Sequence, residues 1–248
     1  MLPSTIYEKI AQARLQNRKL IGILLDPDKL PLEEVENCLQ AIDFEVVDML
    51  LVGGSTVENG DAQALVGEIK KHSSLPVVLF PGDYSQITGQ ADALLFLNLI
   101  SGRNSEYLIN QQVKAVPLLK ETNLEVIPTA YLLIDGGVET SVARVSKTQP
   151  LSPEDEKTIL NTAMAGAFMG NKLLYLEAGS GAKIPVPASL IAELRSHIDI
   201  PIIAGGGIRS HEQLAAAFES GADMVVIGTA FEQNPKILRQ ILKDEHIH

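Results

Sequence analysis

Short apolar runs alternate along the whole chain with stretches in which apolar residues recur at helical spacing. The short runs have the length of β-strands, and most stretches between them have room for a helix. This alternation predicts a parallel sheet, and eight strands favour closure into a (β/α)8 TIM barrel. The predicted strands are Leu20–Leu25, Met49–Val52, Val77–Phe80, Ala93–Leu97, Glu125–Leu133, Lys172–Glu177, Ile202–Ala204 and Met224–Ile227.

Several stretches between the strands carry a helical pattern, and one does not. The link Gly82–Ala91, between the third and fourth predicted strands, is too short for a full helix, so we predict a reduced third outer helix. No linker or change of composition divides the chain, which predicts a single domain over residues 1–248. Helices are predicted over Leu32–Ile42, Ala62–Lys71, Leu190–His197, His211–Ser220 and Pro235–Leu242.

Two further segments are unusual. Asp135–Pro153 is long, rich in Gly, Ser, Thr and Pro, and follows the fifth predicted strand, which places it at the C-terminal mouth of a barrel. It is either a lid or binding loop or a tolerated surface insertion, and both interpretations stay open. Asn161–Gly170 consists largely of small and apolar residues. It predicts a helix packed closely on a neighbour or on another subunit, which suggests a homo-oligomer.

Composition and charge narrow the class of protein. Hydrophobic residues make up 46% of the 248 residues and aromatic residues only 4%, so we expect an aliphatic core. A formal net charge of −11 argues against nucleic-acid binding, and an anionic ligand would need a metal ion or backbone N–H groups. A single cysteine, Cys38, and the lack of a signal sequence or membrane-spanning run indicate a cytoplasmic protein.

Glycine-rich turns follow the last two predicted strands. Ala204–Ile208 reads AGGGI, and Gly228, Thr229 and Ala230 follow the eighth strand. In a barrel these two turns are adjacent, and loops after strands seven and eight commonly bind phosphate. Glycine lets the backbone approach the anion. The alternative interpretation is a pair of tight turns without a ligand.

The turn after the sixth predicted strand carries a carboxylate. Strand periodicity puts Tyr175 and Glu177 on one face and Leu176 on the other. At the mouth of a barrel, Glu177 would act as a general base and Ser180 as a partner for a phosphate or a hydroxyl. The alternative role of Glu177 is a structural ion pair.

The turns after the first two predicted strands suit a magnesium ion. Asp26 ends the first strand, and Mg²⁺ often takes one or two carboxylates together with water and substrate phosphates. Asp28 and Lys29 contribute there or instead cap the next helix and pair at the surface. The hydroxyl groups of Ser55 and Thr56 either complete the metal shell or cap the second helix.

Other common chemistries lack the residues they need. No histidine stands at a strand end with a partner at metal spacing, which argues against a zinc site or a histidine-based triad. No lysine stands at the C-terminal end of a strand, so nothing supports Schiff-base chemistry. The histidines are His72, His197, His211, His246 and His248.

Taken in order, five motifs resemble the geranylgeranylglyceryl phosphate synthase and heptaprenylglyceryl phosphate synthase family. YLEAGSGA is the most specific of them, and the resemblance covers essentially the whole chain. The motifs are LLDPDK at 24–29, GGST at 53–56, YLEAGSGA at 175–182, AGGGIRS at 204–210 and IGTA at 227–230.

The resemblance implies a Mg²⁺-dependent prenyltransferase of ether-lipid synthesis. It would join the C3 hydroxyl of sn-glycerol 1-phosphate to a polyprenyl diphosphate such as geranylgeranyl diphosphate, with release of pyrophosphate. The family pattern places Mg²⁺ on Asp26 and Ser55. The family also tends to have a looser segment in place of its third outer helix. It implies that glycerol phosphate is held by Tyr175, Leu176, Glu177, Ala178, Gly179, Ser180, Gly181, Gly206, Gly207, Gly228 and Thr229.

Two positions separate two branches of the family, the residue before LDPD and the sequence after YLE, where some members have YSG and this chain has AGSGA. Some members carry a lysine directly before LDPD, where this chain has Leu24, so it resembles the branch whose members are often larger oligomers. A prenyl tail needs an apolar groove, which we expect near the ends of the fourth and fifth strands. Candidates for its wall are Leu97, Leu99, Ile127 and Tyr131.

Three alternatives stay open. The first is the same reaction with another prenyl chain length. The second is an isomerase or synthase of another pathway, such as histidine or tryptophan synthesis, built on a phosphate-binding barrel. The third is a barrel without catalytic activity that binds a phosphorylated metabolite or serves as a scaffold. Because the substrate is an amphiphile and no basic amphipathic anchor is visible, we expect at most transient membrane contact.

Overall fold

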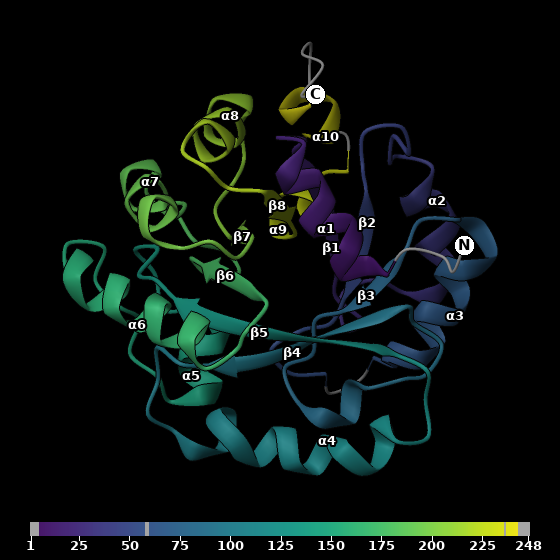
Figure 1. The fold of residues 1–248 in the computed structure, drawn as a ribbon. Coiled ribbons are helices and arrows are strands. Elements are labelled where there is room, and N and C mark those ends of the chain that lie inside the picture. Colours follow the sequence, from purple (N-terminus) through teal and green to yellow (C-terminus); the bar gives the residue numbers. More distant parts are fainter. Residues whose placement is uncertain (1–4, 58–59, 236, 243–248) are drawn as a thin grey trace.

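The computed structural model describes residues 5–57, 60–235 and 237–242. Its centre is a closed barrel of eight parallel strands that neighbour one another in chain order (Figure 1). The (β/α)8 TIM barrel predicted from the sequence is therefore confirmed. The strands are β1 (Leu20–Leu25), β2 (Met49–Val52), β3 (Val77–Leu79), β4 (Ala93–Leu99), β5 (Glu125–Leu133), β6 (Leu173–Glu177), β7 (Ile202–Gly205) and β8 (Met224–Ile227).

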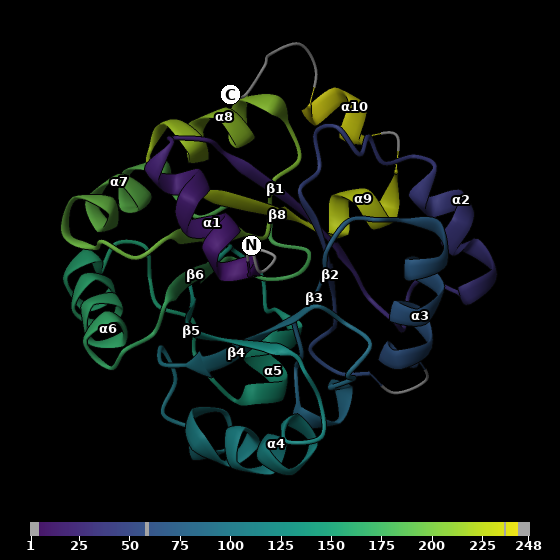
Figure 2. The same ribbon diagram turned by 45° about the vertical axis from the view of Figure 1, so that its right-hand side comes forward.

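Helices surround the barrel, as the two ribbon views show (Figures 1 and 2). Within the described residues, the only helix between β3 and β4 is the short 3₁₀ turn η2, so the predicted reduction of the third outer helix is confirmed. The helices are α1 (Ile6–Leu15), η1 (Leu32–Glu34), α2 (Val35–Leu39), α3 (Ala62–His72), η2 (Tyr84–Gln86), η3 (Glu106–Asn110), α4 (Gln111–Leu119), α5 (Ser141–Ser146), α6 (Glu156–Phe168), α7 (Ala188–His197), α8 (His211–Glu219), α9 (Thr229–Gln233) and α10 (Ile237–Ile241).

Some bounds differ from the sequence-based predictions. The stretch predicted as helical at Asn161–Gly170 overlaps α6, which begins five residues earlier and ends at Phe168. The helix α10 is the part of Pro235–Leu242 that the structure describes as helix. The helical patterns in the sequence did not predict α1 or the η3–α4 segment. The latter begins as a π-helix and contains Pro117, and both features disturb a regular 3.6-residue period.

Alternating side chains of the strands divide the core into two shells. Along β6, Leu173 and Tyr175 belong to the cluster inside the barrel, while Leu174 and Leu176 pack outward against the helices. The face shared by Tyr175 and Glu177 is therefore the barrel interior. All five residues of β6 are buried. The dense packing around the strand therefore holds Glu177, its last residue, in a fixed position.

The N-terminal end of the barrel is closed by α1. This helix buries Ile6 and Ile10 against the interior cluster, and its first N–H groups, those of Ile6 and Tyr7, donate to the Glu125 carboxylate at 2.5 and 3.0 Å. A carboxylate at a helix N-terminus satisfies unpaired donors and favours the helix dipole. The helix α1 does not cover the opposite, C-terminal end, where a ligand would enter. Within the described residues, no helix is both long and apolar enough to cross a bilayer.

Candidate active site

Two joined pockets open at the C-terminal mouth of the barrel. The polar pocket is lined by the ends of β1, β2, β6, β7 and β8, and the apolar pocket lies between β4, η2 and α4. Ser55, Phe80 and Tyr131 line both pockets and so mark their junction. Ten of the predicted site residues line the polar pocket: Asp26, Ser55, Tyr175, Glu177, Ser180, Gly181, Gly206, Gly207, Gly228 and Thr229.

Glu177 is a buried carboxylate at the wall of the polar pocket. It is 6% exposed, and its Oε1 accepts a hydrogen bond of 2.7 Å from the Gly179 N–H. Burial raises the pKa of Glu177 to about 7, and the Gly179 N–H and the Tyr175 hydroxyl offset only part of this effect. Near neutral pH the carboxyl group exists in both protonation states, which is the property that a general base requires.

The backbone of β7 comes very close to this carboxylate. A Cβ atom at Gly205 would lie 2.5 Å from the Tyr175 hydroxyl oxygen and 2.8 Å from Glu177 Oε2, so any side chain there would displace them. Gly206 has a φ of +81°, and its Cβ would lie 2.6 Å from Glu177 Oε1. Glycine at these positions is therefore a condition for placing Glu177 in the pocket.

The turns after β6 and β8 are linked by Thr229. Its hydroxyl oxygen lies 3.0 Å from Ser180 Oγ and accepts a 3.2 Å hydrogen bond from the Gly181 N–H. Thr229 is the first residue of α9, and Gly228 precedes it as the N-cap. Hydroxyl groups and N–H groups from neighbouring turns thus converge on one side of the polar pocket, which is an arrangement suited to a phosphate.

Across the pocket, Asp26 lies beside the turn after β2. A Cβ at Gly54 would lie 2.9 Å from Asp26 Oδ1, so the two turns are in direct contact and bring Ser55 near the carboxylate. The Lys29 ammonium lies 3.1 Å from Asp26 Oδ2 and 3.0 Å from Glu232 Oε2. Burial alone would lower the pKa of Lys29, but its bonds with Glu232 and Asp26 outweigh burial and raise it.

The donor set beside Asp26 fits a magnesium ion that is completed by its substrate. Within residues 5–57, 60–235 and 237–242, no cluster of three or more acidic, histidine or cysteine side chains would enclose a metal. One carboxylate and one hydroxyl leave most coordination positions for water and phosphate oxygens, as Mg²⁺ favours.

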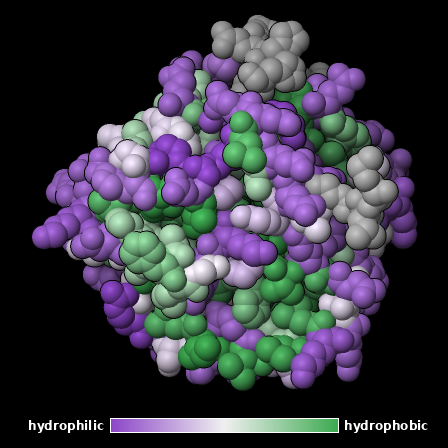
Figure 3. Space-filling model, viewed as in Figure 1, coloured by the Kyte–Doolittle hydropathy of each residue, from purple (hydrophilic) through white to green (hydrophobic). Residues whose placement is uncertain are grey.

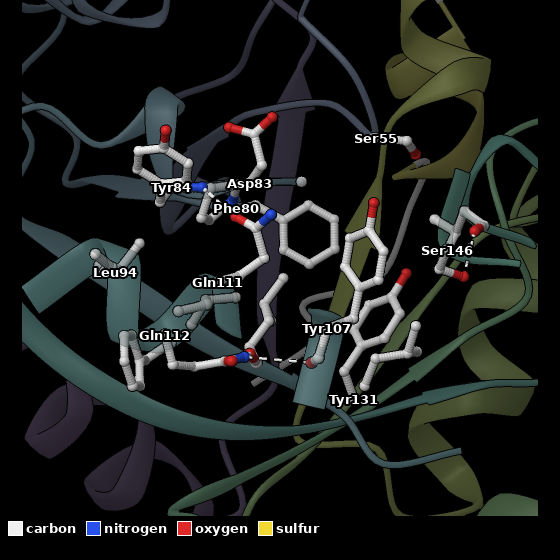
Figure 4. Close-up of a pocket in the computed structure, with 18 of the residues that line it drawn as sticks. Ser55, Phe80, Asp83, Tyr84, Leu94, Tyr107, Gln111, Gln112, Tyr131 and Ser146 are labelled. Carbon is white, nitrogen blue, oxygen red and sulfur yellow. Dashed lines mark hydrogen bonds between the residues drawn. The ribbon is translucent and has the colours of Figure 1, made fainter. Parts of the chain in front are cut away.

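The apolar pocket extends from the junction into the space left by the reduced third helix. In the view of Figure 4, Ser55 and Leu94 lie at opposite ends, with Tyr107 and Tyr131 between them. Its wall is mostly aliphatic and aromatic. Leu97, Leu99 and Tyr131 line it as expected, whereas Ile127 lies in the interior cluster of the barrel and does not.

The segment predicted as a long loop, Asp135–Pro153, contains α5 and lies over the junction of the pockets. Val142 lines both pockets, and Ser146 lines the apolar one. A Cβ at Gly179 would lie 2.0 Å from Thr140 Cγ2, so the segment also packs on the turn that follows Glu177. Of its two interpretations, the position favours a binding loop.

Three predicted substrate-binding residues do not line the polar pocket. The side chains of Leu176 and Ala178 pack outward in the cluster between barrel and helices, because they alternate with the inward-facing Tyr175 and Glu177. Gly179 contributes its N–H to Glu177. Contact of these residues with a substrate stays a prediction, and for Leu176 and Ala178 it would have to involve the backbone.

Other residues of the pockets were not predicted as site residues. Glu232 pairs with Lys29 beside Asp26, and Arg209, whose Nη2 donates to the Ala182 carbonyl at 3.2 Å, lines the polar pocket. An arginine two residues after a glycine turn was an available signal. For the η3–α4 residues Tyr107 and Gln112, which line the apolar pocket, the disturbed helical period left no such signal.

A (β/α)8 barrel with paired phosphate-type turns, a buried carboxylate and an adjoining apolar pocket defines a class: barrel enzymes that act on phosphorylated, partly apolar substrates. The model of the PcrB family matches residues 13–245. The chain therefore belongs to the PcrB family.

Known proteins of high similarity share one activity. The geranylgeranylglyceryl phosphate synthase of Flavobacterium johnsoniae is 52% identical over 231 residues, which cover 93% of this chain and 95% of that protein. The crystal structure of (S)-3-O-geranylgeranylglyceryl phosphate synthase from Thermoplasma acidophilum, in complex with substrate sn-glycerol-1-phosphate, matches with a TM-score of 0.88 at 35% identity and covers 96% of each chain.

A more distant likeness concerns the fold alone. A mutant tryptophan synthase α-subunit from Pyrococcus furiosus matches with a TM-score of 0.56 at 16% identity, over 91% of this chain and 98% of that one. It shares the barrel architecture, and nothing about its reaction transfers at this level of identity.

Proposed function

We propose that this protein is a prenyltransferase that joins sn-glycerol 1-phosphate to geranylgeranyl diphosphate, forming an ether and releasing pyrophosphate. The single observation that carries the proposal is the junction of a polar and an apolar pocket at Ser55, Phe80 and Tyr131, with Glu177 on the polar side. The reaction needs this combination, because one substrate is a small polar phosphate and the other a long hydrocarbon with a charged end. The relatives above carry the same activity in their names.

In this proposal, the glycerol phosphate occupies the polar pocket. Its phosphate lies at the turns that hold Ser180, Gly206, Gly207 and Thr229, which fixes the glycerol so that its C3 hydroxyl faces Glu177. The hydroxyl oxygen attacks C1 of the prenyl diphosphate, and the bond from C1 to the diphosphate oxygen breaks. Pyrophosphate leaves with the electron pair, and the hydroxyl proton passes to Glu177.

The diphosphate end belongs at Asp26 and Ser55, since this side of the junction carries the groups that suit Mg²⁺. When bound there, Mg²⁺ would neutralise charge on the leaving diphosphate. The prenyl tail would extend along Phe80 and Tyr131 into the apolar pocket, which also keeps water from the allylic carbon.

Oligomerisation and membrane contact are further parts of the proposal. At the end of α6, Phe168 is 82% exposed and Met169 67% exposed, in the segment whose composition suggested a subunit contact. On η3 and α4, the aliphatic side chains of Ile109, Val113 and Val116 are also exposed, and Figure 3 shows hydrophobic surface in the corresponding lower region. Patches of this kind favour a homo-oligomer, and transient contact with a lipid surface would deliver the prenyl substrate.

A product assay by mass spectrometry tests the reaction. Purified protein receives geranylgeranyl diphosphate and Mg²⁺ with either sn-glycerol 1-phosphate or sn-glycerol 3-phosphate. We expect an ether product with the first only, and its loss with EDTA or with Asp26→Asn. Product with farnesyl or longer diphosphates instead would assign another chain length. No product with any diphosphate would refute the prenyltransferase and leave a phosphate-binding barrel with another activity.

A further inference from the structure

Gln86 is a buried polar side chain in the segment that replaces the third outer helix. It ends the 3₁₀ turn η2, which Asp83 caps by accepting a 2.7 Å hydrogen bond from the Ser85 N–H. Only 4% of Gln86 is exposed, and it lines neither of the two pockets. A direct contact of Gln86 with either substrate is therefore not part of its role.

The amide of Gln86 forms hydrogen bonds through both its nitrogen and its oxygen with one residue of the neighbouring turn. Its Nε2 donates to the Gly54 carbonyl at 2.9 Å, and its Oε1 accepts from the Gly54 N–H at 3.2 Å. Two opposed bonds to one residue hold the position and the orientation of that part of the chain. Buried hydrogen bonds of this kind are costly to break, because the remaining donor and acceptor lose their partners.

Gly54 stands between Gln86 and the proposed metal site. On one side, a Cβ at Gly54 would lie 2.9 Å from Asp26 Oδ1. On the other side, a Cβ at Gly82 would lie 2.4 Å from the Gly54 carbonyl oxygen and 2.5 Å from that of Ser55. The turn that carries Ser55 is thus clamped between Asp26 and the β3–η2 segment, and Gln86 provides the directional part of this clamp.

The same segment forms one wall of the apolar pocket, since Gly82, Asp83, Tyr84 and Ile87 all line it. Gln86 therefore connects the wall that would hold the prenyl chain with the turn that would hold the diphosphate and its metal. The phosphate side of the polar pocket, at Ser180 and Thr229, is formed by other strands and has no hydrogen bond with Gln86.

We propose that Gln86 is a positioning residue, which fixes Ser55 relative to Asp26 through Gly54 and thereby sets the affinity of the metal–diphosphate site without contributing to glycerol phosphate binding. The proposal rests on the proposed function, since it takes Asp26 and Ser55 as the metal site. Groups that orient metal ligands typically contribute about 10- to 100-fold to metal affinity.

The test measures metal binding and glycerol phosphate binding separately. Mn²⁺ is titrated by electron paramagnetic resonance into protein saturated with geranylgeranyl thiolodiphosphate, an unreactive analogue. Binding of sn-glycerol 1-phosphate without metal is measured by calorimetry. Gln86→Met keeps the length of the side chain without the amide, and Gln86→Glu keeps the acceptor only. Gln90→Met, at an exposed glutamine of the same segment, is the matched control.

We expect both Gln86 variants to bind Mn²⁺ at least about 10-fold more weakly. Their affinity for sn-glycerol 1-phosphate and all properties of Gln90→Met should match the unmodified protein. Unchanged Mn²⁺ affinity, or an equal loss of both ligands, would overturn the proposal. If Gln86→Met does not fold, Gln86→Glu decides alone. Asp26→Asn separates the two hypotheses. If this variant keeps its Mn²⁺ affinity, the proposed metal site itself is wrong. If Asp26→Asn loses Mn²⁺ affinity while Gln86→Met keeps it, only the role of Gln86 is rejected.

Discussion

Among the described residues, two buried carboxylates lie at opposite ends of the barrel, and the groups that surround them differ. At the N-terminal end, Asp223 is 5% exposed, and its Oδ2 accepts from Arg195 Nη1 at 2.9 Å and from the Ile202 N–H at 2.8 Å. The guanidinium of Arg14 lies 3.8 Å away. At the mouth, Glu177 is equally buried and also accepts a backbone hydrogen bond, from the Gly179 N–H, but within the described residues no arginine or lysine pairs with it.

The difference separates stability from function within one fold. Arginines compensate the charge of Asp223, and its contacts connect α7, β7 and the start of β8. Asp223 therefore stabilises the N-terminal end of the barrel. The charge of Glu177 is left largely uncompensated, which costs stability but gives a carboxylate with a pKa near neutrality. In barrels of this type, conserved chemistry belongs to the C-terminal face and stability to the N-terminal face.

Replacing the mouth carboxylate should have the largest effect on activity. Glu177→Gln keeps the shape of the side chain but removes the group that accepts the proton, so kcat should fall by about 10²- to 10⁴-fold. Calorimetric affinity for sn-glycerol 1-phosphate should change little. Glu193→Gln, at a partly exposed carboxylate of α7 that lines neither pocket, is the control. Retention of more than a tenth of the activity would show that another group takes the proton.

Replacing the carboxylate at the base should affect stability and not chemistry. Asp223→Asn leaves the half-buried Arg195 without its charged partner, and breaking a buried pair in this way costs about 3–5 kcal/mol. Denaturant unfolding measures this cost, while kcat per folded molecule should stay the same. Asp199→Asn, an exposed carboxylate near Arg195, should cost far less. If Asp223→Asn unfolds like the unmodified protein, the proposed contrast between the two ends is wrong.

Asp223→Asn should destabilise the protein, whereas Glu177→Gln should stabilise it, by an amount that depends on pH. Folding raises its pKa from the usual 4.5 to about 7, so the folded state holds this proton more tightly than the unfolded state. The resulting stabilisation is complete below pH 4.5 and is lost as pH rises through 7. The free energy of unfolding of Glu177→Gln is compared with that of the unmodified protein at each pH. Between pH 4 and pH 8 this difference should shift by about 3 kcal/mol in favour of the variant. Equal differences at both values would mean that the carboxylate is compensated after all.

The sequence was sufficient for the barrel and for much of the polar site, because both follow from local rules. Strand-sized apolar runs predicted all eight strands, and polar residues directly after them, such as Asp26 and Glu177, lie at the mouth in any closed parallel barrel. Alternation along a strand also predicts that Leu176 faces away from Glu177, and the structure agrees.

What the sequence did not predict depends on long-range packing or on broken local patterns. The capping box of α1, Thr5 with Glu8, was a usable signal that the polar start of the chain obscured. The pairing of Gln86 with Gly54 joins residues 32 positions apart, and no periodicity reveals it. The degree to which burial shifts the pKa of Glu177 likewise requires the three-dimensional surroundings.

The smallest predicted effect tests how Tyr175 acts on the mouth carboxylate. The buried Tyr175 hydroxyl has no hydrogen-bond partner of acceptable geometry among the described residues, although it lies beside Glu177 and lowers the pKa of that carboxyl. Removing it with Tyr175→Phe should cost less than about 1 kcal/mol of stability. The pKa of Glu177 should rise, so the acid limb of kcat/KM should move to higher pH.

Tyr131→Phe provides the matched control for this shift. Tyr131 belongs to the same aromatic cluster, with its ring centroid 5.5 Å from that of Tyr175, but it is not among the groups that alter the pKa of Glu177. Its substitution should leave the position of the acid limb unchanged, whatever it does to KM. A limb that moves equally in both variants would assign the shift to the aromatic cluster as a whole. A limb that moves in neither would mean that backbone groups alone oppose the effect of burial on Glu177.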